Sequence, residues 1–575
     1  MISLILMTGL FFLLSIKDLE SQLQIWSHLA YSYFFSTAIL GGVVLIIGSV
    51  DGTLSNVSVL HMVCFSWVIS LSVLHVRNRL FPKWSLFIDI LKELFSSFSS
   101  FPNGIKIFLA LILLASIGPI NHPDAADYHV GYAFQAFLKG RIINDGGLHL
   151  GLVGLGDWAH LAFLQDHTQW LIRTAQALIL IPAAGVLLEY KTGKWHVLTL
   201  LSAPVMLQWV TIGKPLLMTD ATLAILFINV LKSPDKSRLL QLIHVSLLSL
   251  AFKISSLLIA VPLSLMALFI YNRKSLNRKR NMINMLDMMG LIALITLCSS
   301  VFIFRYSVYT NPFYPFLTSY ITPERLDIIA YADQLLSYGK VHWSWPVDLF
   351  IPRSMGALAF VIGPVILLNV ILRIYVDWKN RHYSLTLSTG LLLIILLLFF
   401  GQGRADYFFS PFFIIIIGSS VLSENYNLNR LIKSFIFIQL MLTGVLLLIN
   451  IGQSLHTFIR PVEAMQRYAY GFSDAQAARD LPKPTLFLSI RQTRLYFDQQ
   501  YVDRDRFKTC LMNLSPDECL QLFSVQSIIV SPNDTKALGI IDNPSWICQD
   551  TMLVKRGSRN PFNYSEVLVQ RWRRR

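Results

Sequence analysis

The side chains best suited to chemistry are ionisable groups in short segments between long apolar runs. The clearest segment, residues 122–129, reads HPDAADYH and follows an apolar run that begins near Ile107. Ionisable groups beside hydrocarbon are costly unless they pair or face water, so this cluster indicates a functional site. Asp124 or Asp127 could take a proton from a hydroxyl as a general base. Alternatively, Asp124 caps the helix that follows and Asp127 lies favourably in its first turn.

Three cations occur at the ends of later apolar runs. Lys253 lies in the sequence AFKISS, Arg305 follows the run that begins at Met285, and Arg404 lies in GQGRADYFFSP. A lysine ammonium and the fork of an arginine are natural partners for a phosphate, above all one that gains negative charge as it leaves. The alternative is that these side chains only extend toward water at the membrane surface. Together with the carboxylates, they predict a site for a lipid phosphate.

These residues must be positioned by membrane-spanning helices. Of the 575 residues, 54% are hydrophobic and 14% are charged, which excludes a water-soluble assembly. Continuous apolar runs such as residues 391–400 favour helices over the alternating strands of an outer-membrane barrel. With roughly 17 to 25 residues in each span, we expect about fourteen helices. They are expected to begin near residues 2, 29, 60, 107, 169, 196, 219, 239, 255, 285, 351, 385, 406 and 434.

The basic loops predict the orientation of these helices. Lysine and arginine gather in segments that the positive-inside rule places in the cytoplasm, namely residues 77–106, 191–194, 232–238, 272–280, 379–382 and 430–433. The opposite side then receives residues 122–151, 213–218, 305–350, 401–404 and the tail. This distribution accounts for the net charge of +15 without a nucleic-acid partner.

The chain therefore divides into three parts. Residues 1–106 form N-terminal spans and a basic cytoplasmic linker, whose stretch 84–95 is suited to lie on the membrane surface. Residues 107–451 form a transmembrane core, and residues 452–575 form an extracytoplasmic soluble domain. In this tail, strand-like runs at 485–490 and 527–531 predict a small α/β or α+β domain.

Two further features of the tail carry expectations. Its cysteines, Cys510, Cys519 and Cys548, allow at most one internal disulfide. The arginine-rich end, residues 571–575, is expected to rest on anionic phospholipid headgroups.

Several segments resemble those of bacterial GT-C glycosyltransferases of the protein O-mannosyltransferase and aminoarabinose transferase type. These integral-membrane enzymes use polyprenyl-phosphate sugars. The matching residues are Asp124, Tyr128 and His129 in the pattern Asp-Ala-x-x-Tyr-His, Asp220 in KPLLMTDATLA, Lys253 in FKIS, Asn311 in TNPFYP, and Arg404 in a pattern Arg-(Tyr/Phe)-x-x-Pro. Thr310 stands where the family more often has glycine, and the segment after Arg404 is longer than in the family. The resemblance extends over residues 122–411.

The resemblance implies a GT-C-like core and an inverting transfer of one sugar from a polyprenyl-phosphate donor. The acceptor, a lipid, a glycan or a protein, would be presented at the extracytoplasmic face of the bacterial inner membrane. A carboxylate of the first loop would be the general base, with Asp124 preferred because it holds the family position and Asp127 orienting the acceptor. Lys253 and Arg305 would stabilise the departing phosphate. The residues expected to contact substrate are Tyr128, His129, Asp220, Lys253, Arg305, Asn311 and Arg404.

Several assignments stay open on the sequence. Tyr128 and His129 are also suited to packing the loop against the helices, and Asp220 to bonding Lys214 or capping its helix. Asp157 and His160 are interpreted as polar residues of a loop, and the alternative is that they line the cavity of the site. Tyr331, Trp343 and Trp345 suit either an interfacial belt or stacking on a sugar or isoprenoid.

Neither the cofactors nor the reaction class is fixed by the sequence. A divalent metal on Asp124, Asp127 and a histidine is possible, but nothing in the residues requires one. The alternative functions are a flippase or exporter of lipid-linked saccharides, and a polymerase or ligase that transfers oligosaccharides. An exporter needs charges along a path through the membrane, whereas only Arg173 and Asp287 interrupt the apolar runs. The gathering of charges on one side favours a one-sided active site.

Overall fold

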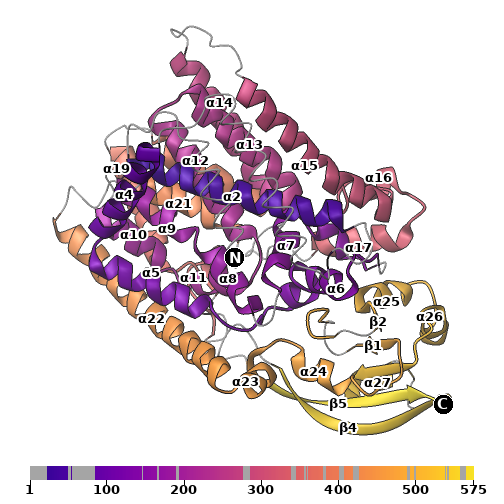
Figure 1. The fold of residues 1–575 in the computed structure, drawn as a ribbon. Helices are drawn as coiled ribbons and strands as arrows, with labels where there is room; N and C mark the ends of the chain where they lie inside the picture. The colour runs from indigo at the N-terminus through magenta and orange to yellow at the C-terminus, as the bar shows by residue number, and fades with distance from the viewer. Residues whose placement is uncertain are drawn as a thin grey trace.

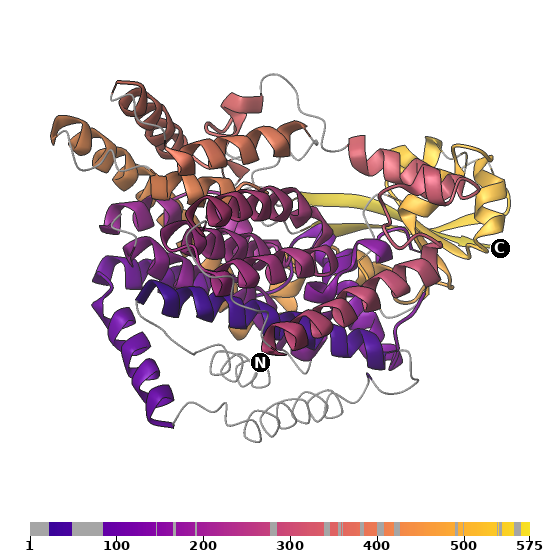
Figure 2. The same ribbon diagram turned by 90° about the horizontal axis from the view of Figure 1, so that it is seen from above.

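The computed structural model is a mainly helical molecule with a small mixed sheet at its C-terminal end (Figure 1). The helices form one body, and the sheet with its own helices lies against one end of that body (Figures 1 and 2). The structure describes residues 22–48, 54, 84–144, 147–164, 168–189, 193–275, 285–337, 345–354, 358, 360–379, 384–399, 407–418, 426–488, 493–497, 500–537, 539, 543–556 and 565–575.

The helical body extends to the end of α22. Its longer helices are α2 (Gln22–Ile47), α4 (Trp84–Ser100), α5 (Asn103–Ser116), α6 (Gly131–Lys139), α9 (Leu180–Leu187), α10 (Gly193–Leu201), α12 (Leu216–Lys232), α13 (Lys236–Phe252), α14 (Leu257–Ser275), α15 (Met285–Tyr309), α17 (Leu326–Ser337), α19 (Pro364–Lys379), α20 (Leu385–Phe399), α21 (Phe409–Gly418) and α22 (Tyr426–Ile459). Shorter helical turns connect them, namely η1 (Ala125–His129), η2 (Leu150–Leu152), α7 (Leu155–Trp158), η3 (Ala159–Phe163), η4 (Thr168–Leu171), α8 (Ile172–Ala177), α11 (Met206–Thr211), η6 (Ile254–Ser256), α16 (Thr318–Ile321) and α18 (Trp345–Asp348).

Three helical segments among the described residues are long and apolar enough to cross a membrane: Gln24–Ile47, Ile254–Arg273 and Arg430–Ile459. A fourth arises if α4 and α5, which meet at 104°, form one broken span. The prediction of about fourteen spans is therefore not confirmed. Helices nevertheless occur near most of the predicted starting points, and the predicted spans near residues 2 and 60 lie outside the described residues.

Prolines explain part of this shortfall. The predicted span that contains Pro204 is divided into α10 and α11, because proline lacks an N–H and its ring clashes with the preceding turn. Backbone groups at the break are bonded elsewhere, since the backbone N–H of Val205 donates to the carbonyl of Val361 at 2.9 Å. The side chain of Gln439 also donates to the hydroxyl of Ser202 at 3.2 Å. Irregular backbone at membrane depth is tolerated when it is buried in protein in this way.

The C-terminal domain follows α22, which continues to Ile459, so the domain begins later than the predicted residue 452. Its sheet has the order β2-β1-β3-β5-β4, with parallel pairs β1/β2 and β1/β3 and antiparallel pairs β3/β5 and β4/β5. Strands β1 and β3 lie within the predicted runs 485–490 and 527–531, and residues 489 and 490 lie outside the described residues. The elements are α23 (Pro461–Tyr468), α24 (Phe472–Ala477), β1 (Thr485–Phe487), β2 (Tyr501–Val502), α25 (Arg504–Cys510), α26 (Pro516–Leu522), β3 (Ser527–Val530), α27 (Pro532–Ala537), β4 (Trp546–Arg556) and β5 (Ser565–Arg574).

The domain has an apolar core on each face of its sheet. In β3, Ile528 and Val530 face the core that contains Phe507 of α25, whereas Ile529 faces the core beside Ala475 of α24. This alternation follows from the two-residue period of a strand. The domain therefore has cores of its own, separate from the main core of the helical body.

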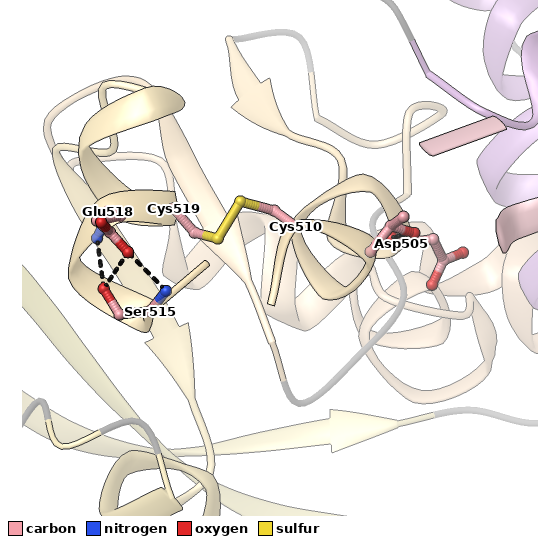
Figure 3. Close-up of a disulfide and its surroundings, with 6 residues drawn as sticks. Asp505, Cys510, Ser515, Glu518 and Cys519 are labelled. Carbon is pink, nitrogen blue, oxygen red and sulfur yellow. Dashed lines mark hydrogen bonds between the residues drawn. A yellow bond between two sulfur atoms is a disulfide. The ribbon is translucent and has the colours of Figure 1, made fainter. Parts of the chain in front are cut away.

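A disulfide joins α25 to α26 (Figure 3). Cys510 and Cys519 form the bond, with their Cα atoms 6.0 Å apart, and Cys548 is a free thiol. Ser515 and Glu518 form a capping box at the start of α26, in which the Glu518 carboxylate accepts from the Ser515 backbone at 2.8 Å and hydroxyl at 2.7 Å. The bridge therefore connects the end of one short helix to another helix that is itself capped.

The first prediction concerns this disulfide. Replacing both Cys510 and Cys519 by serine should lower the free energy of unfolding of the C-terminal domain by about 2 to 3 kcal/mol, because the bridge closes a short loop. Thermal unfolding and limited proteolysis of the full chain would measure the loss. Cys548→Ser is the matched control and should leave the unfolding midpoint unchanged. Labelling of Cys510 and Cys519 by a thiol reagent without prior reduction would contradict the bridge.

Candidate functional site

The site is built around the turn η1, which begins directly after Asp124 and carries Asp127, Tyr128 and His129. Arg173 of α8 fixes the chain that leads into this turn. Its buried guanidinium donates to the last carbonyls of α5 and the residues just beyond, those of Ser116, Ile117 and Pro119, at 2.8, 2.9 and 2.8 Å. A cation at a helix C-terminus is favourable because it bonds to carbonyls that have no helical partner. Arg173 is thus a helix cap.

Asp124 pairs with Lys214, a residue that precedes α12. The Lys214 ammonium lies 2.6 Å from Asp124 Oδ2, and the two side chains are 5% and 14% exposed respectively. Gly213 turns the chain before Lys214 with φ +72°, a left-handed conformation that suits glycine. The backbone N–H of Asp124 donates to His122 Nδ1 at 3.0 Å. The Asp124 side chain makes no capping bond to the turn, so the capping alternative is not observed.

His129 is the centre of a second cluster. Its Nδ1 lies 2.7 Å from Asp157 Oδ1 of α7, and its Nε2 lies 3.4 Å from the ammonium of Lys253, at the junction of α13 and η6. The other Asp157 oxygen accepts from the backbone N–H of Gly154 at 2.9 Å. The Lys253 ammonium also lies 5.7 Å from the centre of the Tyr128 ring, which is within the range of a cation–π contact.

Burial and neighbouring charges shift the titration of this pair. Burial lowers the pKa of His129 well below its ordinary value, and the charges of Lys253 and Lys214 lower it further. Burial raises the pKa of Asp157 to about 7, against the opposing effect of Lys253. A neutral imidazole at neutral pH donates through Nδ1 to Asp157 and accepts through Nε2 from Lys253. The tautomer is inferred from these partners.

Arg305, at the C-terminal part of α15, is fully buried beside this cluster. Its Nε donates to the carbonyl of Gly151 at 2.9 Å, and the Asp157 carboxylate acts on it electrostatically. Within the described residues, its Nη1 and Nη2 have no hydrogen-bond partner. Buried donors of this kind are costly, so the guanidinium is suited to bind an anion.

The segment after Arg305 is tied to the first loop. Tyr309 and Tyr314 stack with ring centres 4.1 Å apart, and their hydroxyls donate to the carbonyls of Gly147 and Leu148 at 2.6 and 2.9 Å. The amide of Asn311 stabilises its own turn, donating to the Phe316 carbonyl at 2.9 Å and accepting from the Phe313 backbone at 2.9 Å. Thr310, where the GT-C pattern more often has glycine, has φ +56°.

Asp127 faces the C-terminal domain. One of its oxygens pairs with Arg494, and the other lies 3.4 Å from Nδ1 of His149. Arg494 also contacts Asp503 at 3.0 Å, and His149 lies 3.5 Å from Asp505 through its Nε2. Asp127 is fully buried, and the carboxylate that was a candidate base pairs with Arg494 through one oxygen and lies beside the His149 ring with the other.

Asp220 supports the segment that carries Lys253. It lies inside α12, where its Oδ1 accepts from Ser256 of η6 at 3.0 Å and its backbone carbonyl accepts from Ser410 of α21 at 2.6 Å. It is therefore not the cap of its helix, which begins at Leu216.

The remaining candidates are less central. His160 donates through Nδ1 to the carbonyl of His129 at 2.9 Å, and Tyr331 meets the His149 ring edge-on at 5.1 Å. Arg404 and Trp343 lie outside the described residues.

The structure thus brings together Asp124, Asp127, Tyr128, His129, Lys253 and Arg305, while Asp220 and Asn311 support the segments around them. Sequence reasoning gave Lys214 no role beside Asp124 and did not identify His149 or Arg494. The signal for Lys214 was present, because a lysine beside an apolar helix needs a counter-charge. Arg494 lies in the polar tail, where arginine is common, and carried no such signal.

Among the described residues, no group of three or more histidine, cysteine or acidic side chains is arranged to hold a metal ion. Comparison of the chain with family models, with curated proteins and with solved structures gave no match.

A second prediction tests the buried pair. Asp157→Asn retains one acceptor oxygen but cannot accept from both His129 and Gly154, so one buried donor loses its partner. We expect a loss of about 1 to 3 kcal/mol in stability, seen as a lower unfolding temperature. Asp480→Asn, at a carboxylate 57% exposed, is the control and should change little. Equal midpoints for Asp157→Asn and the wild type would mean that the pair contributes no stability.

Proposed function

We propose that this protein is a membrane-embedded glycosyltransferase of the GT-C type. It would move one sugar from a polyprenyl-phosphate donor to a cell-envelope acceptor at the extracytoplasmic face, with inversion. The observation that carries the proposal is the meeting of charged residues from four separate helix ends. Asp124 lies 2.6 Å from Lys214, Lys253 lies 3.4 Å from His129, and Arg305 is buried beside Asp157.

Asp124 is the proposed general base. Its side chain is 14% exposed, whereas Asp127 and Asp157 are fully buried and engaged through both oxygens. An acceptor hydroxyl therefore has better access to Asp124 than to the other carboxylates. Asp127 would act by holding the turn that carries Asp124, and Lys214 would orient the carboxylate.

The proposed reaction is a single displacement. The acceptor oxygen attacks the anomeric carbon while its proton passes to Asp124, and the bond from that carbon to the phosphate oxygen breaks. The polyprenyl phosphate leaves with one more negative charge. Lys253 and the Nη groups of Arg305, which have no hydrogen-bond partner among the described residues, would stabilise that charge in surroundings where little water weakens the interaction.

The disulfide supports an extracytoplasmic position for the C-terminal domain, because such bonds persist mainly in oxidising compartments. This agrees with the orientation expected from the basic loops. A multi-pass protein of the bacterial inner membrane, with about fourteen spans, is accordingly part of the proposal.

The exporter alternative has less support. Arg173, one of the charges within the apolar runs, bonds three backbone carbonyls and so has a structural explanation. A polymerase or ligase would use the same chemistry on a longer glycan.

The third prediction tests the base. Asp124→Asn should abolish transfer, with a loss of at least about a hundredfold in kcat, because an amide cannot accept the proton. The measurement is transfer of radiolabelled sugar from polyprenyl phosphate by purified protein in proteoliposomes. Asp235→Asn is the matched control, because asparagine replaces aspartate well at the helix N-cap that Asp235 occupies. Near wild-type turnover by Asp124→Asn would remove Asp124 from the mechanism. Movement of a lipid-linked sugar across the bilayer without transfer would favour the exporter.

The fourth prediction tests donor binding. Lys253→Ala should raise the donor KM about tenfold or more, because a charge-assisted hydrogen bond to the phosphate contributes about 1.5 to 3 kcal/mol. The acceptor KM should change little. Lys139→Ala, at the exposed end of α6, is the matched control. An unchanged donor KM in Lys253→Ala would contradict the assignment of Lys253 to the phosphate.

A further inference from the structure

We propose that the C-terminal domain is a working part of the site and that Arg494 is the positioning residue through which it acts. This inference rests on the proposed function. Arg494 lies between β1 and β2, in the described segment 493–497, and its side chain is fully buried. Its guanidinium pairs with Asp127 of the turn η1 and with Asp503 of its own domain, the latter at 3.0 Å.

The surroundings of Arg494 restrict its position closely. Its guanidinium lies 4.3 Å from the centre of the Tyr132 ring in α6 and 5.0 Å from that of Tyr501 in β2. The backbone beside it is also bonded to the helical body. Leu495 N–H donates to the Ala126 carbonyl at 3.0 Å, and Gln135 donates to the carbonyl of Arg494 at 2.7 Å. These contacts join the domain to the same short stretch of chain, from η1 to α6.

The chemistry of this contact favours positioning over adhesion. A buried ion pair contributes little net stability, because the desolvation of both charges offsets their attraction. Apolar side chains would attach a domain as well. A directional pair, by contrast, fixes the distance and orientation of its partners. Asp127 lies between Asp124 and His129 in sequence, so holding Asp127 holds the proposed base and the residue that contacts Lys253.

A second link supports the same conclusion. The His149 imidazole lies between Asp127 Oδ2, at 3.4 Å, and Asp505 Oδ2 of α25, at 3.5 Å. It also stacks on the Tyr128 ring, with centres 5.1 Å apart and an interplanar angle of 7°. The Asp503 side chain caps α25 by accepting from two backbone N–H groups, each at 3.0 Å. Figure 3 shows Asp505 on the helix that the disulfide ties to α26.

Arg494 acts through Asp127 on the turn that follows Asp124, whereas Lys253 is also supported from outside this turn, because Asp220 accepts from Ser256 in the segment that follows Lys253. Loss of Arg494 should therefore lower kcat more than it weakens donor binding. Lysine at this position should restore part of kcat. Its ammonium can pair with Asp127 but, unlike the guanidinium of arginine, cannot pair with Asp503 at the same time.

The experiment compares Arg494→Gln and Arg494→Lys with Arg556→Gln in the full chain. Arg556 is a matched control in the same domain, because its guanidinium pairs with a carboxylate of that domain, Asp474 of α24, at 3.0 Å. We expect Arg494→Gln to lower kcat at least tenfold, with the donor KM and the Kd for undecaprenyl phosphate within threefold of wild type. Arg494→Lys should recover part of kcat, and Arg556→Gln should match the wild type. Wild-type kcat in Arg494→Gln, or equal losses in Arg494→Gln and Arg556→Gln, would overturn the inference.

Hydrogen exchange separates this inference from the proposed function and does not need activity. Peptides covering residues 122–139 should exchange their amide hydrogens faster in Arg494→Gln than in the wild type. Their exchange rate should be unchanged in Arg556→Gln. Unchanged exchange in Arg494→Gln would overturn the inference even if the enzyme is active. If Arg494→Gln exchanges faster than the wild type but the wild type transfers no sugar, the coupling between the domain and the turn is kept and the glycosyltransferase proposal is rejected. If Arg494→Gln does not fold, Asp503→Asn provides the test, because it removes the charge that pairs with Arg494 in its own domain while asparagine can still cap α25.

Discussion

The arrangement depends on the requirement that a buried charge has a partner. In the short stretch from Asp124 to His129, the two carboxylates and the imidazole are each matched by a residue farther along the chain: Lys214, Arg494 and Asp157. A buried carboxylate left without its partner costs several kcal/mol, so none of these contacts can be given up separately. The conformation of one turn and the positions of three distant segments therefore determine one another.

Arg305 differs from these groups, and the difference has a functional meaning. Asp127 and Asp157 are engaged through both carboxylate oxygens in the scaffold, whereas two of the Arg305 nitrogens have no hydrogen-bond partner among the described residues. Arg305 is fixed through its Nε, which donates to the carbonyl of Gly151, and Tyr309 at the end of α15 accepts from the N–H of the same glycine. The molecule thus separates charges that build the site from a charge that can bind an anion, and this separation agrees with a substrate that carries a phosphate.

A functional residue could be predicted from the sequence only where its type differs from that of the residues around it. Asp124 and Lys253 were identifiable because ionisable side chains are rare among apolar residues. The pairing of Asp127 with Arg494 was not, because the tail is polar and no spacing relates two residues so far apart. The helices were found near the expected positions, but their lengths were overestimated where prolines such as Pro204 divide them. The strands β1 and β3 were found, yet their neighbours in the sheet depend on long-range pairing that no local pattern contains.

The contacts between the helical body and the C-terminal domain differ from those that hold each of them together. Each face of the sheet has an apolar core of its own, and Leu495, Met465 and Ala469 add apolar contacts with the helical body. Around η1 and α6 the domain also shares polar contacts with that body: those of Arg494 and His149, the backbone bond at Ala126 and the side-chain bond of Gln135. Apolar surfaces can slide over one another at little cost, but a buried hydrogen-bonded pair loses most of its energy when its partners move apart. A domain joined in this way sets the geometry of the turn, which is what a proton acceptor at the edge of a membrane would require.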